Sequence, residues 1–121
     1  MKKIEAIIRK TKFEEVKEAL LAADIEWFTY MEVRGVGKAR QSRMYRGVMY
    51  GTDVIERLRL TIIVRDQNVD KTVAAIIASA RTGEVGDGRI FVIDVIDTYS
   101  IRTGEHGDST LFVAKPEKAG K

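Results

Sequence analysis

The chain of 121 residues contains no cysteine and a single histidine, His106. Without cysteine the chain can form neither a disulfide nor a thiolate metal site, and a reduced cytoplasmic setting is the simplest expectation. A lone histidine has no second histidine or cysteine with which to complete a metal site or a nucleophile–base pair. We therefore expect His106 to be a solvated loop residue.

Long apolar runs are absent as well. The first residues, Met-Lys-Lys-Ile-Glu, carry charges every few positions, so the sequence predicts neither a secretory signal nor a membrane-spanning helix. We expect a soluble, cytoplasmic protein with one domain, because a chain of this length fits a single core.

Acidic residues are missing from residues 34–52, although the net charge of the whole chain is only +3. The segment holds five cations, so the other residues together carry −2. It has no sustained apolar period, which predicts a long loop over about 37–53. Loops of this length are usually functional, the alternative being a mobile hairpin tip. The five cations are Arg34, Lys38, Arg40, Arg43 and Arg46.

Hydrophobic periodicity predicts four strands, over residues 3–9, 26–36, 57–64 and 89–96. Helical spacing predicts two helices, over 13–23 and 69–80. The order β-α-β-β-α-β indicates a ferredoxin-like α+β sandwich, with two helices on one face of a four-stranded antiparallel sheet and the long loop inserted between strands two and three.

The other face of that sheet has no predicted cover. Apolar residues there are too many to stay in water as one patch, so we expect the face to pack against copies of the chain. The predicted patch consists of Ile7, Phe28, Tyr30, Phe91 and Ile93.

Residues 82–91 read T-G-E-V-G-D-G-R-I-F. Glycines at 83, 86 and 88 allow positive φ and leave backbone N–H groups accessible, and Arg89 adds a cation beside them, which suits a phosphate. The alternative is a turn that only reverses the chain. Asp87, between two glycines, is expected either to make a turn hydrogen bond or to contact a ligand hydroxyl.

A second cluster of glycines and cations, R-G-V-G-K, ends strand two at residues 34–38, and Arg102 follows strand four. Together with the glycine-rich turn these residues suit capture of an anion in one cleft. Each cluster also has a purely structural explanation. Gly35 and Gly37 could serve only to shape a β-bulge, and Arg102 could serve only to form an ion pair with Glu105.

Other classes of function have less support. RNA-binding sheets of this topology stack bases on aromatic residues of the central strands, and strands one and three have none, so nucleic acid is not expected. An enzyme needs converging catalytic side chains, but the loops offer mainly glycines, cations and the isolated Asp87 and Glu105. We assign no catalytic residue.

Several motifs together resemble the PII nitrogen-regulatory signal proteins: M-K-K-I-E-A-I-I-R at the start, E-V-R-G-V-G-K at 32–38, Y-R-G-V-M-Y at 45–50, T-G-E-V-G-D-G-R-I-F at 82–91 and I-R-T-G-E at 101–105. The resemblance implies one domain over residues 1–112 and a homotrimer that binds ATP or ADP as effectors in clefts between subunits. The composition of the last residues predicts a flexible tail over 113–121, with a short edge strand from Leu111 as the alternative for its start. The long insertion corresponds to the family's T-loop, which docks on ammonium transporters or enzymes of nitrogen and carbon metabolism.

The resemblance also implies roles for individual residues. Arg46 matches a loop arginine that contacts a transporter, and Tyr50 matches a tyrosine that is modified in some relatives, with packing as its alternative role. Arg57 stands where a lysine pairs with 2-oxoglutarate. The implied nucleotide-binding residues are Thr29, Gly35, Gly37, Lys38, Ile63, Val64, Gly86, Asp87, Gly88, Arg89 and Arg102.

Three positions depart from the family pattern. Ala39 replaces a glutamine that binds Mg²⁺, so no metal ligand is expected from the side chains; Arg57 replaces the lysine; and Ser100 replaces an arginine to the terminal phosphate. We therefore expect adenine nucleotides to bind with weak discrimination between ATP and ADP, and 2-oxoglutarate sensing to be reduced or absent. The alternative is a trimeric interaction module that docks its basic loop on a partner without nucleotide.

Overall fold

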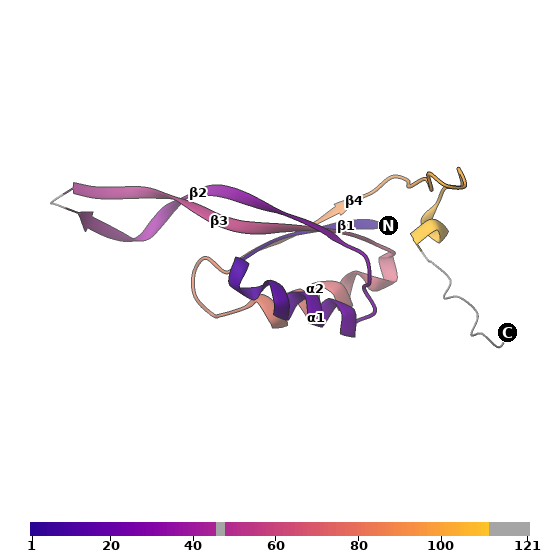
Figure 1. The fold of residues 1–121 in the computed structure, drawn as a ribbon, viewed down its shortest axis with the longest axis horizontal. Helices are drawn as coiled ribbons and strands as arrows, with labels where there is room; N and C mark the ends of the chain where they lie inside the picture. Colours follow the sequence, from indigo (N-terminus) through magenta and orange to yellow (C-terminus); the bar gives the residue numbers. More distant parts are fainter. Residues whose placement is uncertain (46–47, 112–121) are drawn as a thin grey trace.

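The structure is a computed structural model that describes residues 1–45 and 48–111. For residues 38–45 and 48–53 it describes the backbone only. The described chain forms strands and helices in the predicted order (Figure 1). The main elements are β1 (Lys2–Ile8), α1 (Phe13–Ala22), β2 (Thr29–Tyr45), β3 (Val48–Val64), α2 (Val69–Ala80) and β4 (Gly88–Asp94). Short 3-10 helices cover Lys10–Lys12, Asp66–Asn68 and Asp108–Leu111.

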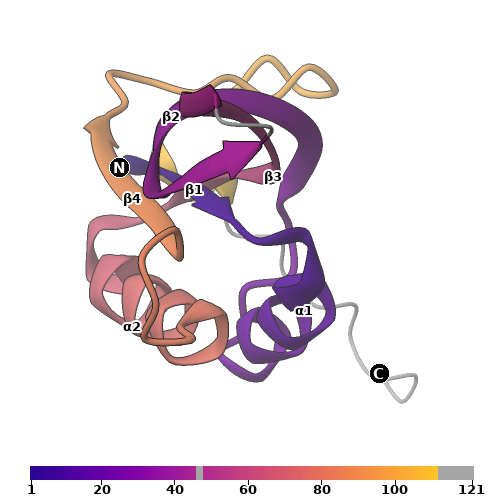
Figure 2. The same cartoon turned by 90° about the vertical axis from the view of Figure 1, so that its left-hand side faces the viewer.

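The four strands form one antiparallel sheet in the order β2-β3-β1-β4. Both α-helices lie side by side on one face of it (Figure 2). This arrangement confirms the predicted ferredoxin-like α+β fold. None of the helices within residues 1–45 and 48–111 is long and apolar enough to cross a membrane.

The core lies between the sheet and the two helices. Alternate residues of β1 and β3 point towards the helices, because side chains of a strand alternate between its faces. Helix residues at three- and four-residue spacing meet them. The buried apolar residues are Ile4, Ala6, Ile8, Val16, Leu20, Ile25, Leu58, Leu60, Ile62, Val64, Ile76 and Ala80.

The insertion between the second and third strands lies where the sequence predicted it, and its backbone continues the pairing of β2 with β3. The predicted strands 26–36 and 57–64 are therefore too short at this end. Periodicity missed the extension because the hairpin projects beyond the helices, so no helix packs on its faces and it needs no apolar alternation (Figure 1). We call this part of the hairpin, residues 34–56, the arm.

Gly35 and Gly37 lie in the regular part of the arm, opposite Ile55 and Asp53. The register shift comes only after Lys38, before Arg43. The alternative in which the two glycines shape a bulge is therefore wrong. Neither glycine has a positive φ.

The uncovered face of the sheet differs in part from the predicted patch. Ile7, Phe91 and Ile93 do lie there, the last two 43% and 41% exposed. Tyr30 instead lies opposite the buried Leu60 and faces the helices, where its ring centroid is 4.5 Å from that of Phe13.

Phe28 is also on the helix side, packed against the core. The prediction placed Phe28 and Tyr30 on the wrong face. Which residues of β2 face the helices depends on how β2 pairs with β3, and the sequence alone does not show that pairing. Thr29 and Met31 take their places on the uncovered face, and Arg59 Nη2 donates a hydrogen bond to Met31 Sδ at 3.0 Å.

Candidate glycine-rich anion site

The glycine-rich turn, residues 82–88, connects α2 with β4. Helix α2 ends at Ala80, and Arg81 is already extended, with φ −74° and ψ 133°. β4 then begins at Gly88, beside the end of β1. The turn therefore lies at the end of the sheet from which the arm projects.

Gly88 is required by packing as well as by conformation. Its φ is +113°, in the region that favours glycine, and a Cβ there would overlap the carbonyl oxygen of Ile7 in β1. Gly88 thus allows β1 and β4 to approach each other, which is a structural role separate from any ligand contact.

Asp87 organises the turn. Its carboxylate accepts hydrogen bonds from the backbone N–H of Thr82 and of Gly83, both at 2.9 Å, and from the Thr82 hydroxyl. These donors, the Thr82 hydroxyl first, hold the pKa of Asp87 well below its usual range. Of the two predicted roles of Asp87, the turn hydrogen bond is confirmed.

Two arginines from distant parts of the chain brace the same turn. Arg9, which follows β1, donates from Nε to Asp87 Oδ1 at 3.1 Å and from Nη2 to the carbonyl of Val85 at 3.2 Å. Arg57 of β3 donates from Nη2 to the carbonyl of Gly86 at 3.1 Å. Burial, and after it the charge of Arg9, lowers the pKa of Arg57.

Sequence reasoning missed Arg9. Its contacts span 76 and 78 residues, and no local pattern reports a contact of that range. Arg57 was assigned only to a possible 2-oxoglutarate contact, whereas its guanidinium is hydrogen-bonded to the turn.

The turn presents donors to its surroundings. Within residues 1–45 and 48–111, no hydrogen bond uses the backbone N–H of Val85 or of Gly86, and both residues are exposed. Gly86 has a φ of +101°. Successive N–H groups in such a turn form a concave site for an anion. Arg89 adds a cation on the uncovered face of the sheet, opposite Ile7.

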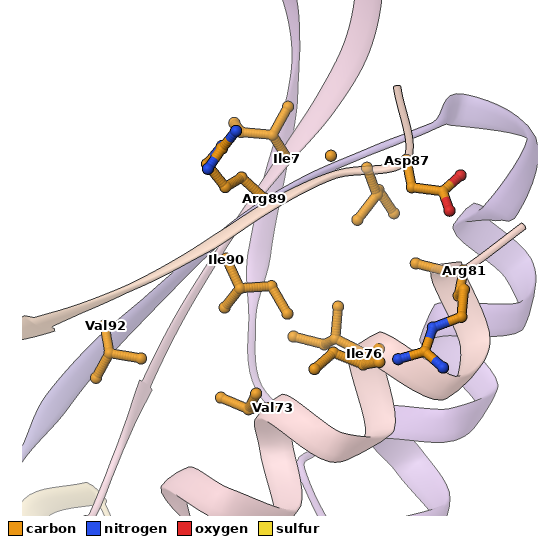
Figure 3. A pocket seen from close by; sticks show the side chains of 12 residues that line it. Ile7, Val73, Ile76, Arg81, Asp87, Arg89, Ile90 and Val92 are labelled. Carbon is orange, nitrogen blue, oxygen red and sulfur yellow. The ribbon is translucent and has the colours of Figure 1, made fainter. Parts of the chain in front are cut away.

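A pocket of about 440 Å³ lies beside the turn, between α2 and the β1–β4 pair (Figure 3). Arg81 and Asp87 are at one end and Val92 is at the other. The carboxylate of Asp87 is already engaged by the turn, and most of the lining is apolar, from residues such as Val73, Ile76 and Ile90. The pocket therefore suits an apolar group better than a phosphate.

The C-terminal loop, residues 97–107, contains its own acidic centre. Asp97 accepts hydrogen bonds from the N–H of Thr98 at 2.8 Å and of Gly107 at 3.1 Å, and lies 3.0 Å from His106 Nδ1. The Thr98 N–H, followed by the hydrogen bond with His106, lowers the pKa of Asp97. The His106 ring stacks on Tyr99 with centroids 5.0 Å apart.

Ser100 and Arg102 have different roles in this loop. Ser100 Oγ accepts a hydrogen bond from the Thr103 N–H at 3.2 Å, and the Ser100 N–H donates to the Glu105 carbonyl at 2.8 Å. Arg102 is exposed, and no ion pair joins it to Glu105 in the part of the chain that the structure describes. The predicted alternative of an Arg102–Glu105 pair is not formed.

The candidate nucleotide residues fall into two clusters at opposite ends of the sheet. One contains Gly35 and Gly37 at the base of the arm, with Arg57 and the turn; the other contains Ile63 and Val64 at the far end of β3 and Arg102 in the loop after β4. Thr29 lies between them, because it pairs with Thr61, which is level with Glu5 in the middle of β1. Ile63 is five residues along β3 from Leu58, which is level with Gly88, and this corresponds to roughly 16 Å. One chain does not bring the clusters together.

One of these residues is buried in the single chain, and several others have no described side chain. The side chain of Val64 is buried in the core, so it is not accessible to a ligand in the single chain. The side chains of Lys38, Ala39 and Tyr50 are not described, and Arg46 lies outside the described residues, as do the residues of the predicted tail, 113–121.

Fold and turn together define a ferredoxin-like α+β protein with a glycine-rich site suited to anions. The family model described as "Nitrogen regulatory protein P-II" matches residues 1–105. The chain belongs to this family.

Relatives with the same name agree. A nitrogen regulatory protein P-II of Microchaete diplosiphon is 50% identical over 93 residues, which is 76% of this chain and 83% of the relative. Nitrogen regulatory protein P-II 1 of Methanothermobacter thermautotrophicus is 49% identical over 102 residues, covering 84% and 89%. A P-II protein of Klebsiella oxytoca is 44% identical over 96 residues, covering 78% and 86%.

Proposed function

We propose that this P-II family member is a homotrimeric regulator that binds ATP or ADP between subunits and acts on a partner protein through its arm. The separation of the candidate residues into two clusters carries the proposal. Because Ile63 and Val64 lie roughly 16 Å along β3 from the level of the turn, one chain does not form a single compact site from both groups, and this separation supports a site completed by a second copy of the chain.

Exposed apolar surface supports assembly. Phe91 and Ile93 lie on the uncovered face, and Ile96 and Ile101, in the segment after β4, are fully exposed. Burial of such side chains between subunits is favourable by roughly 25 cal/mol per Å² removed from water. A second copy of the chain would therefore bury this apolar surface. The same contact would bring its Ile63 and Arg102 towards the glycine-rich turn of the first copy.

The phosphate end of the nucleotide is assigned to the glycine-rich turn. The N–H groups of Val85 and Gly86 and the guanidinium of Arg89 would bind phosphate oxygens from one subunit, and Arg102 would approach from the neighbour. Thr29 and Ile63 of the neighbour would contact the adenine.

The arm is the partner-binding element of this proposal, and it corresponds to the T-loop. It is a two-stranded ribbon projecting beyond the helices, and such a ribbon is marginally stable alone, so a partner can select its conformation. Arg46 would contact the partner, and Tyr50 is a candidate for modification. The partner would be an ammonium transporter or an enzyme of nitrogen or carbon metabolism.

Weak discrimination between ATP and ADP, and reduced sensing of 2-oxoglutarate, are part of the proposal. Ala39 has no donor atom for Mg²⁺, Ser100 is used in the hydrogen bonds of its own loop, and Arg57 is engaged by Gly86. Each of these residues stands where the family pattern has a contact to the last phosphate, Mg²⁺ or 2-oxoglutarate.

Titration calorimetry tests the proposal, with ATP, ADP and AMP as ligands, with and without Mg²⁺ and 2-oxoglutarate. We expect ATP and ADP to bind with similar affinity, and 2-oxoglutarate to change neither by more than a few-fold. Tight, ATP-dependent binding of 2-oxoglutarate would contradict reduced sensing. If no nucleotide binds, the chain is better described as a nucleotide-independent interaction module.

Complementation between variants tests the location of the site. Arg89→Ala removes a residue of one cluster and Arg102→Ala a residue of the other, and both side chains are exposed. Each variant alone should bind ADP weakly, whereas every mixed trimer contains one site with both arginines. Random mixing of equal amounts should restore about a quarter of the sites. No restoration in verified mixed trimers would place both arginines in one subunit's site.

A further inference from the structure

We propose that Arg9 is a positioning residue for the phosphate contacts of the glycine-rich turn. The inference rests on the proposed nucleotide function and deepens it, because it assigns a task to a side chain outside the candidate ligand contacts. Arg9 directly follows β1 and precedes the 3-10 helix Lys10–Lys12, and its carbonyl accepts a hydrogen bond from the Lys12 N–H at 3.0 Å.

The guanidinium of Arg9 meets the turn at three consecutive residues. It binds the Val85 carbonyl through Nη2 and the Asp87 carboxylate through Nε. It also lies against Gly86, where an added Cβ would be only 3.3 Å from Nη2. The Arg9 side chain is 26% exposed and that of Asp87 is 24% exposed, so this contact is partly sheltered from water.

These contacts decide which polar groups the turn presents to a ligand. A carbonyl oxygen repels an anion and an N–H group attracts it. Arg9 holds the carbonyl of Val85 and Arg57 holds that of Gly86, while the N–H groups of the same two residues donate to no group in the described chain. The two guanidiniums therefore fix the turn with its carbonyls engaged by protein and its donors accessible.

Arg9 has a second effect, through charge. Asp87 is ionised and lies next to the proposed phosphate contacts, where a carboxylate would repel the ligand. The ion pair at 3.1 Å offsets that negative charge. Loss of Arg9 would leave the Asp87 carboxylate with less positive charge beside it, and phosphate binding would weaken even if the backbone kept its shape.

The test compares three variants, Arg9→Met, Arg9→Lys and the matched control Arg81→Met. Arg81 immediately precedes the turn and forms no ion pair within the described residues, so the control removes one arginine charge nearby without touching Asp87 or Val85. For each protein the affinities for ADP and for adenosine are measured, together with hydrogen exchange of the amides of residues 83–88 without ligand.

We expect Arg9→Met to weaken ADP binding at least tenfold, to leave adenosine binding within twofold of wild type, and to speed amide exchange in the turn. Arg9→Lys keeps the charge but cannot make the forked contact, and should lose about threefold. Arg81→Met should stay within twofold in every measurement.

Three outcomes would overturn the inference. They are an unchanged affinity of Arg9→Met for ADP, an equal loss for ADP and adenosine, and an equal loss in Arg81→Met. If wild type binds neither ADP nor ATP, the proposed function itself fails, and the positioning role fails with it. The wild-type titration distinguishes that failure from the other three.

Discussion

The glycine-rich turn and the C-terminal loop are both built around an aspartate, but they are anchored differently. Asp87 and Asp97 each accept backbone N–H groups from neighbouring residues. Asp87 is in addition bound to Arg9, 78 residues away, whereas the partners of Asp97 all lie within ten residues of it.

The range of these contacts indicates how each loop contributes to a binding site. Contacts with Arg9, Arg57 and the backbone of β1 hold the turn, so the turn is organised without a ligand. The C-terminal loop is held by contacts within the loop itself, and its Ile101 and Arg102 are both exposed to solvent. In the proposed site between subunits, the turn would be the half fixed by the sheet, and the C-terminal loop would be the half held by its own local contacts.

The largest expected effect comes from Gly88→Ala, which breaks the long-range anchoring of the turn. The added Cβ overlaps the Ile7 carbonyl and the residue must keep a positive φ, so we expect a loss of about 3 kcal/mol or more in the free energy of unfolding. Chemical denaturation measures it. Gly88→Ala is therefore a poor test of ligand binding.

Gly83→Ala is the matched control, because Gly83 also has a positive φ, +93°, but a Cβ there has nothing within 4 Å. The expected loss is about 1 kcal/mol, from conformation alone. Equal losses in the two variants would show that overlap with Ile7 does not matter and would remove the main reason for calling the turn anchored.

Asp87→Asn has the next largest expected effect. It keeps the shape of the side chain but removes the charge that the Thr82 and Gly83 donors and Arg9 stabilise. The pKa of Asp87 is lowered in the folded state, so its stabilising effect is present above the unfolded pKa of about 3.9 and is lost as the pH falls towards the folded value.

We therefore expect wild type to have a higher urea midpoint than Asp87→Asn at pH 7, with a gap that narrows below about pH 4. The comparison is made in urea across this pH range. A gap that stays constant would mean that the charge of Asp87 is not what holds the turn.

Asp97→Asn has the smallest expected effect on the whole protein, because its contacts are local. The urea midpoint should stay near that of wild type, while the amides of Thr98 and Gly107 should exchange faster with solvent. A large drop in the midpoint would show that the C-terminal loop supports the sheet, and the contrast with the turn would not hold.

Much of the fold was predictable from the sequence, because buried apolar residues recur at the spacing of the strand or helix that contains them. Alternation in β1, with Ile4, Ala6 and Ile8, and helical spacing in α1 and α2 gave the order of elements and the sandwich. The glycines at 86 and 88 and the turn role of Asp87 were also within reach, since positive φ and turn hydrogen bonds are local properties.

The rest depended on pairing between distant segments. The face occupied by Tyr30 follows from its register with Leu60, and the arm extends beyond the helices through the pairing of β2 with β3. Arg9 acts through contacts to residues near the other end of the chain. Sequence periodicity carries no information about such partners.

The register shift of the arm has a consequence for how its length can vary in evolution. Pairing is regular from Thr29–Thr61 to Lys38–Thr52, and resumes with Arg43–Tyr50 after unequal stretches of the two strands. A residue gained or lost on one side of the arm would be absorbed at that irregularity, so the buried residues of β3 would keep facing α1 and α2. Insertions and deletions can thus remodel the tip of the hairpin while the sheet keeps its register.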